Sequence, residues 1–141
     1  MRRMSMDELR AFLAAGTRTA KIATVSADGH PHVVPVWFVL DGDDMVITTA
    51  SGSAKARHLA ADPRVSIAVD DERPPFAFVH VRATATLHLK PDDLLTWTTR
   101  VARRYAGEEA AEELGRRYAE LDDLIIRVPI VDAVGHAEVV G

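Results

Sequence analysis

The segment Ile47-Thr-Thr-Ala-Ser-Gly-Ser-Ala-Lys-Ala-Arg-His-Leu59 joins an apolar run to a stretch with helical spacing. It predicts a β-strand that ends in hydroxyl residues, turns through Gly52 and opens a short helix carrying Lys55 and Arg57. A helix N-terminus presents unpaired backbone N–H groups and the positive end of the helix dipole. With hydroxyl groups upstream and two cations in the first turns, this junction is a candidate anion site best suited to a phosphate.

The same junction also has a purely structural interpretation. Ser53 is of the residue type that caps helix N-termini in many proteins, and Lys55 and Arg57 also suit a solvated helix face. The segment lacks the spacing of a Walker loop and the Gly-x-Gly-x-x-Gly pattern of a dinucleotide-binding fold, so neither motif applies. Local pattern alone therefore leaves both interpretations open.

The rest of the chain alternates between strand and turn patterns. Ser5-Met-Asp-Glu8 fits a capping box and predicts a helix over 6–15. Pro35 lies within an apolar strand pattern, which implies a sheet edge or a bulge because proline cannot donate to the ladder. The expected strands are 19–25, 32–40 and 44–49, forming a meander, then 65–69, 76–89 and 124–140, the last broken or bulged near Pro129. The expected later helices are 54–61, 91–106 and 108–120. This order predicts a mainly β chain, a six- to seven-stranded antiparallel Greek-key-type barrel with short flanking helices.

Length and composition exclude several classes of protein. The 141 residues predict one domain over 1–141. A net charge of −4 leaves no basic surplus for nucleic acid. No apolar run approaches the roughly 18 residues that span a bilayer, and the N-terminus has no secretory-signal pattern, so we expect a cytoplasmic protein without a membrane partner. The absence of cysteine removes disulfides and thiolate catalysis. Abundant Ala, Val and Arg favour a high-GC bacterial source.

Other side chains form no recognised catalytic or metal-binding pattern. The six histidines lack a zinc-site spacing, so no metal site is expected. No Gly-x-Ser-x-Gly nucleophile elbow occurs. The paired carboxylates fall at predicted turns or element ends, where acidic residues commonly cap, so no catalytic pair is expected. These pairs are Asp43-Asp44, Asp70-Asp71, Asp92-Asp93 and Asp122-Asp123. The segment Pro35-Val-Trp-Phe38 lies one hairpin from the phosphate candidate, which places it to wall a pocket there.

Three segments together carry a resemblance to a known family. They are Ala23-Thr-Val-Ser-Ala-Asp-Gly-His-Pro-His-Val-Val-Pro-Val-Trp-Phe38, Ile47-Thr-Thr, and Ser53-Ala-Lys-Ala-Arg-His-Leu-Ala-Ala-Asp-Pro-Arg-Val65. In this combination the chain resembles the pyridoxamine 5′-phosphate oxidase-like split β-barrel proteins. It is most similar to the actinobacterial branch that uses the deazaflavin coenzyme F420 instead of FMN. The likeness is strong over roughly residues 6–90.

The resemblance implies a homodimer with two cofactor sites at the subunit interface. By likeness, the cofactor phosphate is held by Thr48, Thr49, Ser53 and Lys55, with Arg57 nearby. The ring is lined by the strand that carries Pro35, Val36 and Trp37, and an aromatic residue of the partner, Phe76 or Phe78, closes the site.

The function implied by the resemblance is hydride transfer between F420 and a small organic substrate, with no obligatory acid or base assigned. An FMN-dependent reductase or oxidase on the same fold, or a non-catalytic cofactor carrier, are the alternatives. The chain lacks the C-terminal Arg-x-His motif of true pyridoxamine phosphate oxidases and ends Val134-Gly-His-Ala-Glu-Val-Val-Gly141, so vitamin salvage is not expected.

Overall fold

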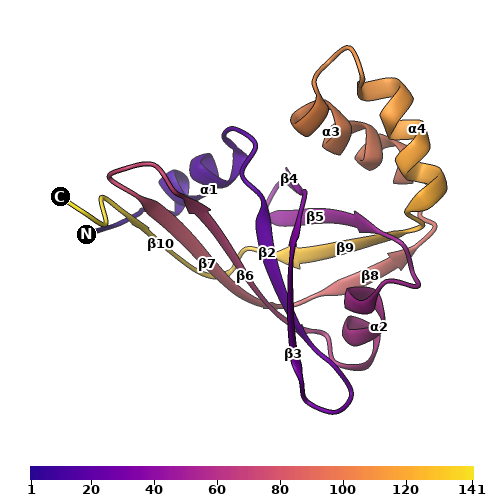
Figure 1. The fold of residues 1–141 in the computed structure, drawn as a ribbon, viewed down its shortest axis with the longest axis horizontal. Coiled ribbons are helices and arrows are strands. Elements are labelled where there is room, and N and C mark those ends of the chain that lie inside the picture. Colours follow the sequence, from indigo (N-terminus) through magenta and orange to yellow (C-terminus); the bar gives the residue numbers. More distant parts are fainter.

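Ten β-strands form two antiparallel sheets in the computed structural model, which describes residues 1–141 (Figure 1). The larger sheet has the order β1 (Arg2–Arg3), β10 (Asp132–Ala137), β7 (Ala77–Thr84), β6 (Arg64–Asp71), β2 (Ala20–Val25) and β3 (Pro31–Val36). The smaller sheet has the order β4 (Val39–Asp41), β5 (Asp44–Thr49), β9 (Leu124–Pro129) and β8 (Thr86–Leu89). Two sheets that share one core in this way confirm the mainly β, split-barrel prediction.

The stretches 32–40 and 76–89, which the sequence predicts as single strands, each divide between the two sheets, and the stretch 124–140 divides next to Pro129, where a break or bulge is predicted. The chain changes sheet between β3 and β4 at Trp37-Phe38, between β7 and β8 at Ala85, and between β9 and β10 at Ile130-Val131. The structure therefore has more strands than the six or seven expected. The predicted meander over 19–49 is wrong for the same reason, because β4 and β5 leave the sheet that holds β2 and β3.

Pro35 lies in β3, which is the edge strand of the larger sheet. It is the register partner of Lys21 on β2, and its other side has no neighbouring strand. Because no strand lies on that side, the missing N–H of proline leaves no ladder hydrogen bond unmade. The edge expected from the sequence is therefore confirmed. The interruption of the strand falls two residues later than Pro35, at Trp37.

The core lies between the inner faces of the two sheets. Its largest cluster holds 20 buried residues, among them Ile22, Ile67 and Val81 of the larger sheet and Ile47 and Ile126 of the smaller. Helix α1 (Met6–Ala14) adds two buried leucines, and its capping box is present as the sequence predicts. Burial of this apolar surface is the main stabilising term for the barrel.

The remaining helices lie at one end of the molecule (Figure 1). They are α2 (Ala54–Ala61), α3 (Leu94–Ala106) and α4 (Ala111–Leu121). The second predicted helix begins at the expected residue, whereas α3 and α4 each begin three residues later than expected because turns precede them. Helix α3 packs on the outer side of the smaller sheet, where Val46, Trp97, Val101 and Ile125 share a second apolar cluster. None of the helices is both long and apolar enough to cross a membrane.

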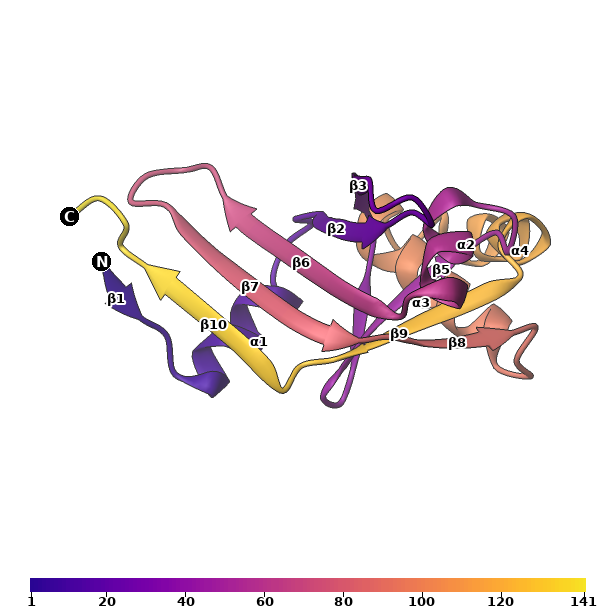
Figure 2. The same cartoon turned by 90° about the horizontal axis from the view of Figure 1, so that it is seen from below.

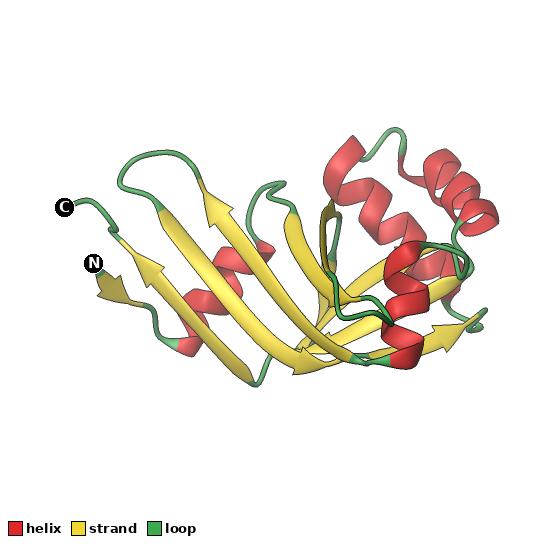
Figure 3. Ribbon diagram, turned by 60° about the horizontal axis from the view of Figure 1, so that its bottom comes forward, coloured by secondary structure: helices red, strands yellow, loops and turns green.

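The outer face of the larger sheet carries no such cover. Figures 2 and 3 show β10, β7 and β6 side by side with α1 behind them and no helix in front. Along β6 the inward residues Val65, Ile67 and Val69 are buried, while Ala68 between them is exposed. On the edge strand, Val33 is 65% exposed. This sheet therefore presents a broad, partly apolar surface to its surroundings.

Candidate functional site

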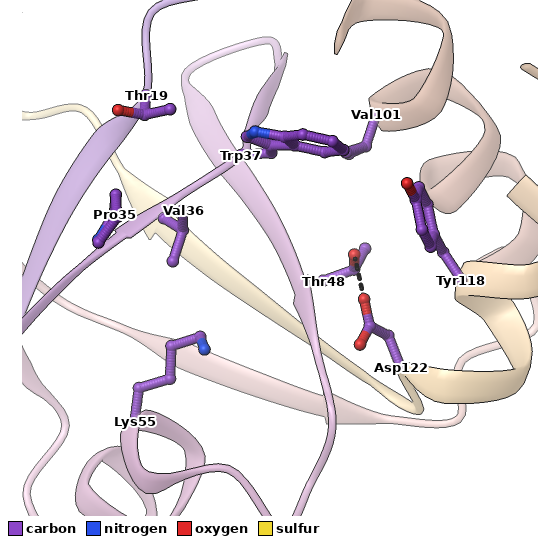
Figure 4. A pocket seen from close by; sticks show the side chains of 9 residues that line it. All are labelled: Thr19, Pro35, Val36, Trp37, Thr48, Lys55, Val101, Tyr118 and Asp122. Carbon is purple, nitrogen blue, oxygen red and sulfur yellow. Dashed lines mark hydrogen bonds between the residues drawn. The ribbon is translucent and has the colours of Figure 1, made fainter. Parts of the chain in front are cut away.

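A pocket of about 360 Å3 lies where the barrel meets the helical end of the molecule (Figure 4). Strands β3 and β5 supply one side of it, α2 lies at its base, and α3 and α4 close the opposite side. Its lining residues are Thr19, Pro35, Val36, Trp37, Thr48, Lys55, Val101, Tyr118 and Asp122. The pocket thus combines an apolar wall with a few polar groups, which is the composition typical of small-molecule sites.

Trp37 forms the flat wall of the pocket. Its indole stacks on the Tyr105 ring at a centroid distance of 4.8 Å and an interplanar angle of 3°. Tyr105 is itself fixed, because its hydroxyl donates a hydrogen bond to the carbonyl of Arg18 at 2.9 Å. The Tyr118 ring meets Trp37 edge-on at 6.2 Å. Trp37 keeps 40% of its surface exposed, so it offers a rigid aromatic face to a ligand.

Lys55 is the single cation among the lining residues. It lies in the first turn of α2 and its side chain extends from the helix toward Val36 (Figure 4). Partial burial lowers the pKa of its ammonium group, and the charge of Asp122 acts in the opposite direction. A half-buried ammonium group without an ion-pair partner is available to an anionic ligand.

Asp122 is the single carboxyl group among the lining residues. Its carboxylate accepts a hydrogen bond of 3.1 Å from the Thr48 hydroxyl. Burial raises the pKa of this carboxyl above its ordinary value, and the Thr48 hydrogen bond and the charge of Lys55 partly offset that rise. The pocket therefore contains one positive and one negative group that are not directly paired.

The position of Asp122 follows from the pairing of β5 with β9. In this antiparallel ladder Thr48 is opposite Ile125 and Thr49 is opposite Leu124, so the start of β9 lies beside the end of β5. The neighbouring Asp123 accepts hydrogen bonds from the Ser51 backbone N–H at 2.6 Å and from its hydroxyl at 2.9 Å. The two aspartates thus lie in the connection between α4 and β9. Asp123 holds the β5–α2 loop through Ser51, and Asp122 faces the pocket.

Five of the ten residues predicted for the cofactor site line this one pocket: Pro35, Val36, Trp37, Thr48 and Lys55. Thr49 and Ser53 lie just outside it, with the Thr49 hydroxyl donating to Ser53 Oγ at 3.0 Å. Ser53 is the N-cap of α2 and accepts a hydrogen bond from the Ala56 backbone N–H. Its Oγ thus accepts two hydrogen bonds and keeps its own hydrogen free to donate.

Three predicted residues lie elsewhere. Arg57 is exposed and donates to the Gly52 carbonyl, so its guanidinium closes the loop and does not line the pocket. Phe76 and Phe78 belong to the turn before β7 and to β7 itself, at the end of the larger sheet far from α2 (Figure 1). Phe78 packs against His136. One of these two phenylalanines is expected to reach the site of a second copy, and within one chain both are remote from the pocket.

Sequence reasoning missed four lining residues: Thr19, Val101, Tyr118 and Asp122. Asp122 was assigned only to a turn, because an Asp-Asp pair after a helix has a common capping explanation. The signal available in the sequence was the position of Asp122 shortly before a predicted strand, the first part of which, β9, pairs with β5. That pairing is not visible in the local pattern, so the two segments first meet in the tertiary structure.

Comparison with protein families decides where the chain belongs. The profile of the pyridoxamine 5′-phosphate oxidase family matches residues 5–128, which is most of the chain. The chain belongs to the pyridoxamine 5′-phosphate oxidase family. The family resemblance drawn from residues 23–65 is thereby confirmed, and the fold is the flavin-binding split barrel of this family. No functionally curated protein matches the chain.

Solved structures with the same fold differ in what they bind. A conserved hypothetical protein, Rv2991 from Mycobacterium tuberculosis, superposes with a TM-score of 0.82 at 24% identity, covering 96% of this chain and 86% of that one. An F420 reductase superposes with a TM-score of 0.67 at 26% identity, covering 86% of this chain and 93% of that one. A heme-binding protein from Mycobacterium smegmatis gives 0.61 at 25% identity, covering 91% of this chain and 52% of that one.

Proposed function

We propose that this protein is an F420-dependent oxidoreductase that transfers a hydride between the deazaflavin and a small organic substrate. The observation that carries the proposal is the pocket in which the rigid Trp37 face and the Lys55 ammonium group line one cavity. A deazaflavin consists of a planar ring joined through a ribityl chain to a phosphate. The F420 reductase among the structural relatives supports the choice of this cofactor over other flavins.

The residues of the pocket fit such a ligand. Trp37 offers an aromatic face to the ring, while Lys55 and the free hydrogen of the Ser53 hydroxyl are placed to bind the phosphate. The cofactor, when bound, supplies the hydride chemistry, and the protein supplies binding, orientation and electrostatics. Val36 and Val101 add apolar surface that limits access of water to the bound ring.

The proposal includes a homodimer with the cofactor sites at the interface. The uncovered outer face of the larger sheet supports it, because partly apolar sheet faces of this extent are normally buried against another layer. A second copy on this face is also the route by which Phe76 or Phe78, remote from the pocket of their own chain, would reach a cofactor.

Heme binding is the second candidate function. It is favoured by the heme-binding protein of Mycobacterium smegmatis among the structural relatives. Heme iron is held in proteins by His, Cys, Met or Tyr, and of these residue types only Tyr118 lines the pocket. Titration with hemin, followed by the Soret band, gives a saturable shift in this case and none if the pocket is specific for deazaflavin.

Fluorescence titration of the purified protein with F420 and, separately, with FMN tests the proposed function. We expect saturable micromolar binding of F420 and weaker binding of FMN. Failure of both cofactors to bind would contradict the proposal. Reoxidation of the reduced, bound cofactor by a panel of small acceptors then separates an enzyme from a carrier protein.

The variant Lys55→Ala tests the phosphate anchor within the same titration. It should weaken F420 affinity at least tenfold, about 1.4 kcal/mol, because it removes a charge-assisted contact to the phosphate. The exposed Lys90→Ala is the control for loss of one positive charge outside the pocket. Equal affinities of wild type and Lys55→Ala would show that the phosphate does not bind at α2.

A further inference from the structure

Asp122 introduces a negative charge into the space that the proposed function assigns to an anion. Asp122 and Lys55 are the two ionised groups of opposite sign that line the pocket, and both side chains point into it (Figure 4). An anion that reaches Lys55 therefore also approaches a carboxylate. Because the Coulomb energy is proportional to charge, each further negative charge on the ligand adds an equal increment of repulsion from this carboxylate.

The charge of Asp122 is not cancelled by a direct partner. The carboxylate accepts its hydrogen bond from the neutral Thr48 hydroxyl. The neighbouring Asp123 is engaged by the Ser51 N–H and hydroxyl. The junction therefore holds two carboxylates, and the Lys55 ammonium group is the positive group opposed to them in the pocket.

The two cofactors considered differ in charge at the phosphate. FMN ends in a phosphate monoester, which carries close to two negative charges above its second pKa of about 6. The phosphate of F420 is a diester and carries one. The Asp122 carboxylate therefore opposes a doubly charged phosphate about twice as strongly as a singly charged one, and this repulsion offsets the stronger attraction of the dianion to Lys55.

We propose that Asp122 is the specificity-determining residue of this site, selecting against phosphate monoesters such as FMN in favour of phosphodiesters such as F420. This inference rests on the proposed function, because it assumes that the cofactor phosphate binds beside Lys55. It assigns to Asp122 a role in selecting the cofactor and none in hydride transfer.

The test compares how much the phosphate of FMN adds to binding with and without the carboxylate. Riboflavin and FMN share the ring and the ribityl chain, so the ratio of their dissociation constants isolates the phosphate. Fluorescence titration at pH 8 would give this ratio for wild type, Asp122→Asn and Asp122→Ser. Asparagine keeps the size of the side chain and an oxygen for the Thr48 hydroxyl, and serine provides a second neutral variant of different shape.

Both neutral variants should bind FMN about tenfold more tightly than wild type, while riboflavin affinity stays the same and F420 affinity changes less than about threefold. Glu120→Gln, an exposed carboxylate two residues away on α4, is the matched control and should leave all three affinities unchanged. If neither neutral variant gains FMN affinity, or if Glu120→Gln gains as much, the inference is overturned.

The outcomes also separate this inference from the function on which it rests. Wild type that binds F420, together with neutral variants that gain nothing for FMN, leaves the proposed function standing and removes the role of Asp122. Wild type that fails to bind F420, together with variants that gain FMN binding, removes the F420 function and keeps Asp122 as the group that disfavours dianions.

Discussion

Trp37 gains its position from the break between β3 and β4. The residues on either side of the break belong to different sheets, so the indole is presented at the gap between the sheets instead of on a regular sheet face. Stacking on Tyr105 fixes the orientation of the ring. The second tryptophan, Trp97, is buried on α3 and donates a hydrogen bond from its indole N–H to Asp93. The two tryptophans are therefore distinguishable probes, one in the pocket and one in the core.

Replacement of Trp37 should remove the spectroscopic signal of cofactor binding. We expect a bound flavin or deazaflavin to quench tryptophan fluorescence in wild type, and we expect Trp37→Phe to lose most of this change while Trp97→Phe retains it. Trp37→Ala should also weaken riboflavin binding about two- to tenfold, because one aromatic stacking contact is worth about 0.5–1.5 kcal/mol. Persistence of the full quench in Trp37→Phe would place the ring away from this wall.

Helices α3 and α4 lie outside the barrel core and form part of the site. They supply Val101 and Tyr118 to the pocket, the C-cap of α4 supplies Asp122, and the two helices approach each other closely at Gly115. The Thr98 hydroxyl donates to the Gly115 carbonyl at 2.8 Å across this contact. The helix contact thus positions the side of the pocket that carries the carboxylate.

Gly115→Ala should destabilise the protein by about 1–2 kcal/mol. A Cβ at this position would clash with Thr99 Oγ1 and lie 2.7 Å from Thr99 Cα, so the two helices must move apart. The cost of overpacking, about 1–3 kcal/mol, exceeds the gain of up to about 1 kcal/mol from replacing glycine within a helix. Chemical denaturation of the wild type and the variant measures the difference.

Gly135→Ala provides the comparison for that measurement. Its Cβ would meet the Met4 sulfur at 2.7 Å, which is the end of a flexible side chain that can move aside. We expect a smaller loss of stability here than at Gly115. An equal loss at both positions would mean that the α3–α4 contact is not specially tight.

At the scale of the whole molecule, the barrel buries one face of the larger sheet and leaves the other uncovered. The inner face supplies seven residues of the 20-residue core, whereas the outer face mixes small and polar residues around Ala68 and ends in the exposed Val33. A layered domain normally covers such a face with helices or with another sheet. The proposed homodimer supplies that second layer.

Ala68→Arg should convert the protein from a dimer to a monomer in sedimentation velocity experiments. A long charged side chain in the middle of the outer face would have to be buried without a partner on association. The matched control Ala11→Arg, on the exposed side of α1, should remain a dimer. F420 affinity should fall together with dimerisation if the cofactor sites lie at the interface. A stable wild-type monomer that binds F420 would contradict the interface site.

Sequence alone determined the features that depend on neighbouring residues. The capping box of α1, the bounds of α2, the position of Ser53 at its N-terminus and the edge character of Pro35 all follow from local hydrogen-bonding and backbone constraints. The motifs over residues 23–65 were sufficient for the family, because their types and spacings occur together in it.

Only the tertiary structure decided where long strands change sheet and which distant residues meet. A strand that continues in its own sheet and one that crosses to a second sheet have the same alternating pattern, so the divisions at Trp37-Phe38 and Ala85 are not visible in the sequence, whereas Pro129 marked the third. Asp122 is 74 residues from Thr48 in the chain and is brought to it by the pairing of β9 with β5. Long-range pairing of this kind depends on the free energy of the whole fold, and it placed a carboxylate beside Lys55.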